Sequence, residues 1–282
     1  LAVMLVLLVV SAYPLYFVVI ASLSDPSQVV AGKVIVLPQG FTLAGYERVL
    51  EYDKLWTGYR NTIIYTVFHT VIATFITLLT GFALSRKTLP GRLGIMLFMA
   101  FTMYFSGGMI PSYLLLKNLG FVGNQVLYVL IGTVSVYNVI ITRTFMESNI
   151  SDTLMEAAQI DGCNMIRFFF GIVLPLSPAI IAILALFYAV GQWNSWFNAM
   201  LYLRDTQMPL QNVLRNILKT SSLTAEMGAE SAVGSSDADA QTLLVESMRY
   251  AVIIVSSLPV MCLYPFVQKY FIKGIMVGAI KG

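Results

Sequence analysis

The chain has 282 residues, of which 58% are hydrophobic and only 11% are charged. Soluble domains carry about 25% charged residues, so this chain is expected to reside in a membrane. The net charge of +3 is too small to indicate nucleic-acid binding, and the two cysteines, Cys163 and Cys262, provide neither a disulfide framework nor metal-ligand spacing.

Six apolar runs are long enough to span a bilayer, which requires about 20 residues per helix. They lie at 1–24, 61–85, 93–116, 123–145, 173–202 and 249–272. We expect helices, because the runs are too long and too continuous for the alternating strands of a barrel. The first run could instead be a signal peptide, but it exceeds the usual length and lacks an A-x-A cleavage site. The predicted fold class is therefore an all-α integral membrane protein with six transmembrane helices in a single domain, 1–282.

The distribution of basic residues predicts the orientation in the membrane. Six spans place both termini on one side, together with the loops 86–92 and 146–172. The segments 25–60 and 203–248 lie on the other side with the short loop 117–122. Both sides carry similar numbers of Lys and Arg, but the first set of loops is shorter and therefore more densely basic. The positive-inside rule then assigns both termini to the cytoplasm.

A short polar island, "EAAQIDGCNMIRFFFGIVLP", lies in and just after the loop 146–172. Thr153 and Glu156 fit a capping box at the start of a helix. Gly162 can take the left-handed turn that ends this helix, and Asn164 can cap a second one. The pattern predicts two short cytoplasmic helices shaped to fit a partner's groove. An ordinary interfacial linker is the alternative that composition alone leaves open.

The island resembles the EAA signature of permease subunits in bacterial ABC importers, with glutamate, two alanines, glycine and the final leucine-proline at the family's spacing. The resemblance continues in "GFALSRKTLPGR" at 81–92, "GGMIPSYLLLKNLG" at 107–120 and "QWNSWFNAMLYLRD" at 192–205. These segments are similar to the second permease of maltose-type (MalG-like) importers, and several resemble permeases for acidic oligosaccharides such as alginate fragments. The residues that the resemblance assigns to ATPase coupling are Glu156, Ala157, Ala158, Asp161, Gly162, Ile172, Leu174 and Pro175.

Membership of that family would imply a transport subunit, not an enzyme, that moves oligosaccharides across the bacterial inner membrane. Its expected partners are a second, different permease, two ATPase subunits that hold ATP and Mg, an extracytoplasmic sugar-binding protein and membrane lipid, with no nucleic acid. The family also implies that the EAA helices dock into a cleft on the ATPase. The external loop 203–248 would reach into the binding protein as a scoop, and 25–60 is a second docking candidate. The scoop residues are Thr224, Gly228, Gly234 and Ala240.

The absence of phosphate-loop and catalytic motifs from this chain agrees with a transport subunit whose ATP is hydrolysed by a partner. No glycine begins a G-x-x-x-x-G-K-[ST] phosphate loop, so another chain must hydrolyse ATP. Neither an H-E-x-x-H zinc motif nor a G-x-S-x-G elbow occurs, so no catalytic residue, metal or cofactor is expected in this chain. A similar permease for a non-sugar solute and a secondary transporter are the alternatives, although the spans hold no carboxylate to relay protons. His69, the one ionisable group deep in a span, is expected to be packed and neutral, with a pore role as the alternative.

The fifth apolar run carries the candidate residues for a sugar path. A sugar hydroxyl left unpaired in a dry site costs about 1–3 kcal/mol, so such a path needs hydrogen-bonding groups. On one continuous helix, Asn194, Asn198 and Tyr202 would share a face with Gly191. Trp193 would lie about 27 Å along the helix from Pro175, close to the outer boundary, where tryptophans could equally belong to the interfacial belt. The candidate path residues are Gln192, Trp193, Asn194, Trp196, Asn198 and Tyr202.

Overall fold

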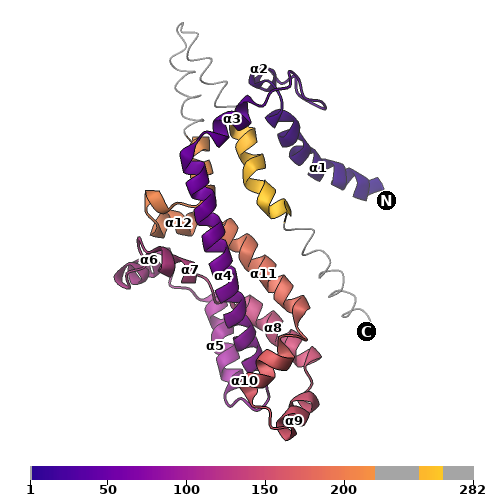
Figure 1. Cartoon of the computed structure of the whole chain (residues 1–282), viewed down its shortest axis with the longest axis vertical. Helices are drawn as coiled ribbons and strands as arrows, with labels where there is room; N and C mark the ends of the chain where they lie inside the picture. The colour runs from indigo at the N-terminus through magenta and orange to yellow at the C-terminus, as the bar shows by residue number, and fades with distance from the viewer. Residues whose placement is uncertain (1, 220–247, 263–282) are drawn as a thin grey trace. The chain divides into compact units, whose positions relative to one another are not determined.

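The computed structural model describes residues 2–219 and 248–262, and all the regular secondary structure in these residues is helical (Figure 1). The chain divides into two compact units. Among the described residues, one unit consists of 2–62, 206–219 and 248–262, and the other of 63–205.

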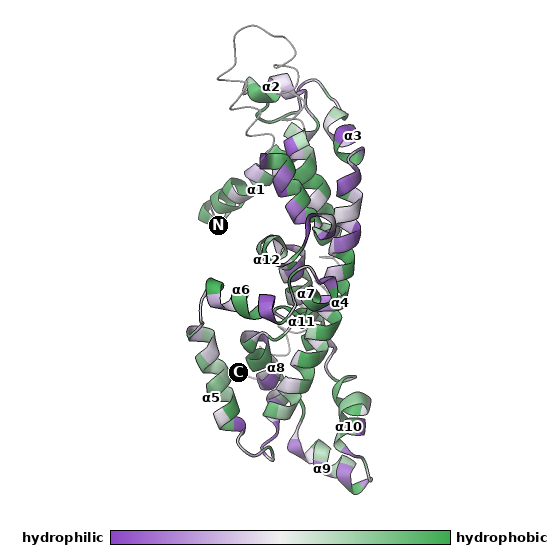
Figure 2. Ribbon diagram, turned by 90° about the vertical axis from the view of Figure 1, so that its left-hand side faces the viewer, coloured by the Kyte–Doolittle hydropathy of each residue, from purple (hydrophilic) through white to green (hydrophobic). Residues whose placement is uncertain are grey.

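The first unit is built from the N-terminal helices and two later segments. Its helices are α1 (Ala2–Ser22), α2 (Pro26–Val30), α3 (Ala44–Leu50), a helix at 210–219 and the helix Met248–Cys262. No charged residue occurs in α1, whose 21 residues are long enough to cross a bilayer core of about 30 Å. Hydrophobic residues extend along α1 in Figure 2. Asp25 caps α2, because its carboxylate accepts a hydrogen bond from the amide of Ser27 at 2.8 Å.

The long helix α4 (Asp53–Ser85) begins in the first unit and continues into the second. The other helical elements of the second unit are α5 (Arg92–Tyr104), α6 (Met109–Asn118), α7 (Gln125–Leu130), α8 (Val136–Asn149), α9 (Asp152–Ile160), α10 (Met165–Phe168), a π-helical turn at Phe169–Val173, α11 (Pro178–Trp193) and α12 (Trp196–Tyr202). A short 3-10 turn, Asp205–Gln207, follows α12. The main hydrophobic cluster of this unit includes Phe82, Met146, Phe168 and Leu184, so its core forms where α4, α8, α10 and α11 meet.

Two helices in the described residues, α1 and α4, are long and apolar enough to cross a membrane alone. Two further pairs pass the same test only together, because α5 and α6 are bent by 114° and Met165–Val173 and α11 by 87°. The described residues therefore contain two to four candidate spans, whereas the sequence predicted six continuous ones. The last predicted run, 249–272, is described only as far as Cys262.

The differences have local causes that hydropathy does not reveal. Gly108, with φ of 84°, interrupts the predicted run 93–116 between α5 and α6. Gly132, with φ of 78°, interrupts 123–145 between α7 and α8. The run 173–202 is broken before Pro178, which lies in the first turn of α11 and lacks an amide hydrogen, and again between α11 and α12. Long apolar runs predicted the membrane residence but not these bends.

Candidate functional site

The polar island folds into α9, a turn and α10, which lie together at one end of the second unit (Figure 1). The hydroxyl of Ser151 caps α9 by accepting a hydrogen bond from the amide of Leu154 at 3.2 Å. The predicted capping box of Thr153 and Glu156 is therefore wrong, because the helix begins already at Asp152. The hydroxyl of Thr153 instead lies 2.9 Å from that of Ser151.

The turn between the two short helices forms as predicted. Gly162 has a φ of 76°, in the left-handed region that glycine adopts without steric cost. The next amide, that of Cys163, donates to the carbonyl of Ala158 at 2.8 Å and so closes the end of α9. Asn164 then caps α10, since its side chain accepts from the amide of Arg167 at 2.8 Å. The predicted order of helix, turn and helix is confirmed.

One face of this segment packs into its own unit. Met155 and Ala158 of α9 are buried, and they belong to the same hydrophobic cluster as Phe168 and Phe169. The rings of Phe169 and Phe82 lie 5.3 Å apart, which connects the segment to the end of α4. Ala158, one of the predicted coupling residues, therefore contributes to packing and not to an exposed surface.

The opposite face is exposed and contains two large apolar side chains. Ile160 is 87% exposed and Ile166 is 71% exposed. Five predicted coupling residues are also exposed, whereas Ile172 and Leu174 are partly buried. The exposed five are Glu156, Ala157, Asp161, Gly162 and Pro175. Ile160 and Ile166 were not among the predicted coupling residues, because exposure at a helix end cannot be inferred from hydropathy. We name the exposed set of Glu156, Ala157, Ile160, Asp161 and Ile166 the outward face.

A buried arginine fixes the position of α9. Arg86 directly follows α4 and is only 3% exposed. Its guanidinium donates to the carbonyls of Met146 at 3.4 Å and Ile150 at 3.2 Å, at the end of α8. The same group lies 3.4 Å from the carboxylate of Asp152, the first residue of α9. Burial lowers the pKa of the Arg86 guanidinium, while the nearby carboxylates of Asp152 and Glu147 raise it.

These contacts connect three elements through one side chain. The C-terminal end of a helix attracts cations, so Arg86 stabilises the end of α8, where the carbonyl of Met146 also accepts the amide of Ile150 at 3.0 Å, while it pairs with the start of α9. The guanidinium also lies 5.3 Å from the centre of the Phe82 ring in α4. In the sequence, only the place of Arg86 immediately after a long apolar run could have indicated this role.

The predicted sugar-path residues do not share one helical face. Asn194 lies in the break between α11 and α12, so the continuous helix assumed for 173–202 is wrong. Trp193 and Tyr202 are buried, whereas Asn194, Trp196 and Asn198 are exposed and Gln192 is partly buried. The ring of Tyr202 stacks on Tyr113 at 5.9 Å. The indole nitrogen of Trp193 has no hydrogen-bond partner among the described residues.

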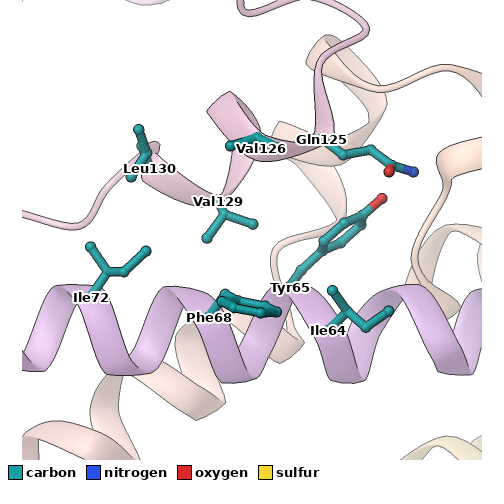
Figure 3. A pocket seen from close by; sticks show the side chains of 8 residues that line it. All are labelled: Ile64, Tyr65, Phe68, Ile72, Gln125, Val126, Val129 and Leu130. Carbon is teal, nitrogen blue, oxygen red and sulfur yellow. The ribbon is translucent and has the colours of Figure 1, made fainter.

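A cavity of about 260 Å³ lies between α4 and α7 (Figure 3). Its lining is Ile64, Tyr65, Phe68, Ile72, Gln125, Val126, Val129 and Leu130. Only the side chains of Tyr65 and Gln125, which hydrogen-bond to each other, bring polar groups to it. A cavity with so few hydrogen-bonding groups does not suit a sugar, whose many hydroxyls each need a partner.

His69 lies next to this cavity and has the contacts of a packed residue. It is buried, and its Nδ1 atom lies 2.8 Å from the carbonyl oxygen of Val129. Its ring packs edge-on against Tyr188 at 5.8 Å. The part of the chain that the structure describes has no cluster of His, Cys, Asp or Glu residues that could hold a metal ion. The predicted scoop residues Thr224, Gly228, Gly234 and Ala240 lie outside the described residues.

Comparisons with known proteins agree with the resemblance seen in the sequence, although no family model matches the chain. It is 38% identical over 280 residues to the polygalacturonan/rhamnogalacturonan transport system permease protein YtcP of Bacillus subtilis (strain 168), covering 99% of this chain and 96% of that protein. It is 26% identical over 251 residues to the melibiose/raffinose/stachyose import permease protein MelC of the same organism, covering 88% and 84%.

A solved structure supports the same relationship. The chain matches the crystal structure of a bacterial ABC transporter involved in the import of the acidic polysaccharide alginate, with a TM-score of 0.84 and 32% sequence identity. The match covers 96% of this chain and 94% of that one. The all-helical arrangement described above is therefore shared with a solved transporter chain.

Proposed function

The chain belongs to the permease subunits of carbohydrate ABC importers, multi-pass proteins of the bacterial inner membrane, and from this premise we propose that α9 and α10 couple it to an ATPase subunit. As a permease it is a transport component and not an enzyme. Permeases of this family normally carry no cofactor, and an ABC importer complex includes ATPase subunits and other transport partners.

The observation that carries the coupling proposal is the contrast between the two faces of α9 and α10. The inner face is held by the hydrophobic cluster and by Arg86, so this segment can move together with the ends of α4 and α8. The outward face presents Ile160 and Ile166 to the surroundings, with the carboxylates of Glu156 and Asp161 beside them. Burying an isoleucine side chain contributes about 1.5–3 kcal/mol, so a hydrophobic cleft on an ATPase would bind this face.

The finer architecture is part of the same proposal. Six spans would arise if α1, α4, the bent pair α5 and α6, the pair α7 and α8, the bent pair ending in α11, and the helix that begins at Met248 each cross the membrane. The partners would be a second, different permease, two ATPase subunits that bind ATP and Mg, and an extracytoplasmic sugar-binding protein. The external segments 25–60 and 203–248 would contact that binding protein.

An acidic oligosaccharide is the proposed substrate class. The relative with 38% identity is named for polygalacturonan and rhamnogalacturonan, and the solved structure concerns the acidic polysaccharide alginate. These polymers share uronic-acid units, which carry a carboxylate at neutral pH. A neutral oligosaccharide, as named for the relative with 26% identity, is the competing class.

The coupling proposal is tested with the importer reconstituted in liposomes. Ile160→Asp replaces the most exposed apolar side chain of the outward face with a charge, and we expect it to lower ATPase binding and substrate-stimulated ATP hydrolysis at least tenfold, which corresponds to about 1.4 kcal/mol. Ser148→Asp, at an exposed position on α8, is the matched control and should leave both unchanged. Normal binding and stimulation with Ile160→Asp would contradict the proposal.

A competition experiment separates the two substrate classes. Galacturonate and neutral oligomers are each added as competitors, and the competitor that lowers uptake by the reconstituted importer identifies the class.

A further inference from the structure

Three threonines with buried hydroxyls lie on one face of α4. Thr66, Thr70 and Thr74 follow one another at intervals of one helical turn, so they share that face. Thr66 and Thr74 are each 8% exposed, and the hydroxyl oxygens of all three residues are buried. None of these hydroxyls has a hydrogen-bond partner among the described residues. We name these residues the threonine row.

Other threonines of the same unit show how a helix usually pairs such a hydroxyl. The hydroxyl of Thr80 donates to the carbonyl of Ile76 at 2.8 Å, and that of Thr142 donates to the carbonyl of Asn138 at 2.7 Å. This bond, to the carbonyl four residues earlier, is open to any threonine inside a helix. The threonine row does not use it, so its hydroxyls are directed away from the carbonyls of the preceding turn.

The helix α11 lies beside α4 and passes this row (Figure 1). The hydroxyl of Tyr188 in α11 lies 2.6 Å from that of Thr77, and the ring of Tyr188 packs edge-on against His69. These two contacts on α4 are about 12 Å apart along the helix axis. Thr70 and Thr74 fall between them in the sequence. This part of the row is therefore next to a helix of its own unit, and a second permease could not pair its hydroxyls while α11 stays in this position.

With α11 in this position, the hydroxyls of the row have lost water without gaining a partner. Burial of an unpaired hydroxyl costs free energy, and an apolar neighbour does not offset that cost. The arrangement is therefore less stable than it would be with paired hydroxyls. In contrast, Thr77 lies on the same face of α4 and is paired with Tyr188, and this contact stabilises the arrangement.

We propose that α11 moves away from α4 during the transport cycle, and that water then enters between the two helices and hydrates the threonine row. The contact of Thr77 with Tyr188 holds the closed arrangement, in which α11 covers the row, and the unpaired hydroxyls favour the open one. A hydrated face of hydroxyls, which both donate and accept hydrogen bonds, is also compatible with the passage of a sugar. This inference rests on the chain being a permease and does not depend on coupling through α9 and α10.

The test measures how fast a cysteine in the row reacts. Thr74→Cys is made with Cys163→Ser and Cys262→Ser, and the complete importer is placed in nanodiscs, which leave both membrane faces open to reagents. A charged methanethiosulfonate reacts with the thiolate, which forms in water and not in an apolar interior, so we expect rates that differ about tenfold between the nucleotide-free importer and the importer trapped with ATP, Mg and vanadate. Mass spectrometry of this subunit follows the reaction. Equal rates in the two states would overturn the proposal.

Val71→Cys is the matched control for position. Val71 lies on α4 within one turn of Thr74, but it is 63% exposed and α11 does not cover it. Its reaction rate should be the same in both states. A change at Val71 as large as the change at Thr74 would show a rearrangement that is not confined to the α4–α11 contact, and this result would also overturn the proposal.

A variant of the row tests whether the unpaired hydroxyls favour the open arrangement. Thr66→Val combined with Thr70→Val replaces two unpaired hydroxyls with methyl groups of the same shape, which removes the cost of burying them. We expect the faster of the two rates at Thr74→Cys to fall several-fold. Thr80→Val, at a threonine whose hydroxyl bonds its own helix, is the control and should leave that rate unchanged. An unchanged rate in the double variant would contradict the proposal.

Tyr188→Phe tests the contact that holds the closed arrangement. It keeps the ring and leaves the Thr77 hydroxyl without its partner, so the slower of the two rates at Thr74→Cys should rise several-fold. The valine and phenylalanine variants thus have opposite expected effects, whereas general damage to the subunit would raise both rates. A slower rate in Tyr188→Phe would contradict the proposal, and if this variant does not assemble, the valine variant and the comparison of the two states still decide it.

Discussion

Arg86 combines burial with four kinds of partner: helix-end carbonyls, the hydroxyl of Ser85, the carboxylate of Asp152 and the ring of Phe82. A buried cation is tolerated only when its hydrogen-bonding groups are paired, and this one is paired with the ends of the elements that hold α9. In contrast, Arg143 bonds Glu147 on its own helix at 2.9 Å and is more exposed. We therefore expect Arg86 to contribute much more to the stability of the subunit than Arg143.

Arg86→Ala should destabilise the subunit by at least about 2 kcal/mol, because hydrogen bonds to charged groups each contribute about 1.5–3 kcal/mol. Arg143→Ala is the control and should cost about 0.3–0.5 kcal/mol, as exposed pairs one helical turn apart do. Thermal unfolding of the two variants in detergent measures the difference. Equal unfolding temperatures for both variants would show that the contacts of Arg86 contribute no stability.

At the scale of single elements, the short helix α9 illustrates what sequence reasoning can locate. The glycine turn at Gly162 and the asparagine cap at Asn164 were predicted correctly, because each depends on the conformational preference of one residue type. The start of α9 was placed too late. Ser151, Asp152 and Thr153 are all good capping residues, and the choice among them depends on tertiary contacts such as the pair of Asp152 with Arg86.

The caps allow a direct test at this scale. Ser151→Ala should destabilise α9 by about 1 kcal/mol, the usual cost of removing a cap, whereas Thr153→Ala should cost clearly less. Faster amide hydrogen exchange across 154–160 in Ser151→Ala alone is the expected result. Faster exchange in Thr153→Ala alone would restore the capping box predicted from the sequence.

The apolar runs show the limit of prediction for longer elements. Hydropathy located the long helices α1 and α4, since composition alone requires burial in lipid. It did not reveal the bends after Tyr104 and before Pro178, or the break at Asn194, because glycine, proline and neighbouring helices decide these locally. The single helical face predicted for 173–202 is wrong for this reason, because the helix breaks at Asn194, whereas the assignment of these residues to a sugar path stays a prediction.

At the scale of the whole molecule, composition, the EAA spacing and the comparisons agree on an importer permease. The positive-inside rule predicts an orientation from the higher density of Lys and Arg in the shorter loops, because the numbers of these residues on the two sides are similar. Arg86 is one of the basic residues in the loop 86–92, but it pairs with Asp152 and with helix-end carbonyls. Its presence there is therefore explained by the fold and is weak evidence for orientation. The orientation consequently needs a measurement that does not depend on charge.

Cysteine labelling provides that measurement. In the background with Cys163→Ser and Cys262→Ser, Gln39→Cys should react with a membrane-impermeant maleimide in intact spheroplasts, because 25–60 follows one span from a cytoplasmic N-terminus. Ser148→Cys, exposed at the end of α8, should react only after permeabilisation, since an even number of spans precedes it under the six-span arrangement. Labelling of Ser148→Cys in intact spheroplasts would place α9 and α10 outside the cell. The outward face would then have no access to ATP or to an ATPase, and both the topology and the coupling proposal would be wrong.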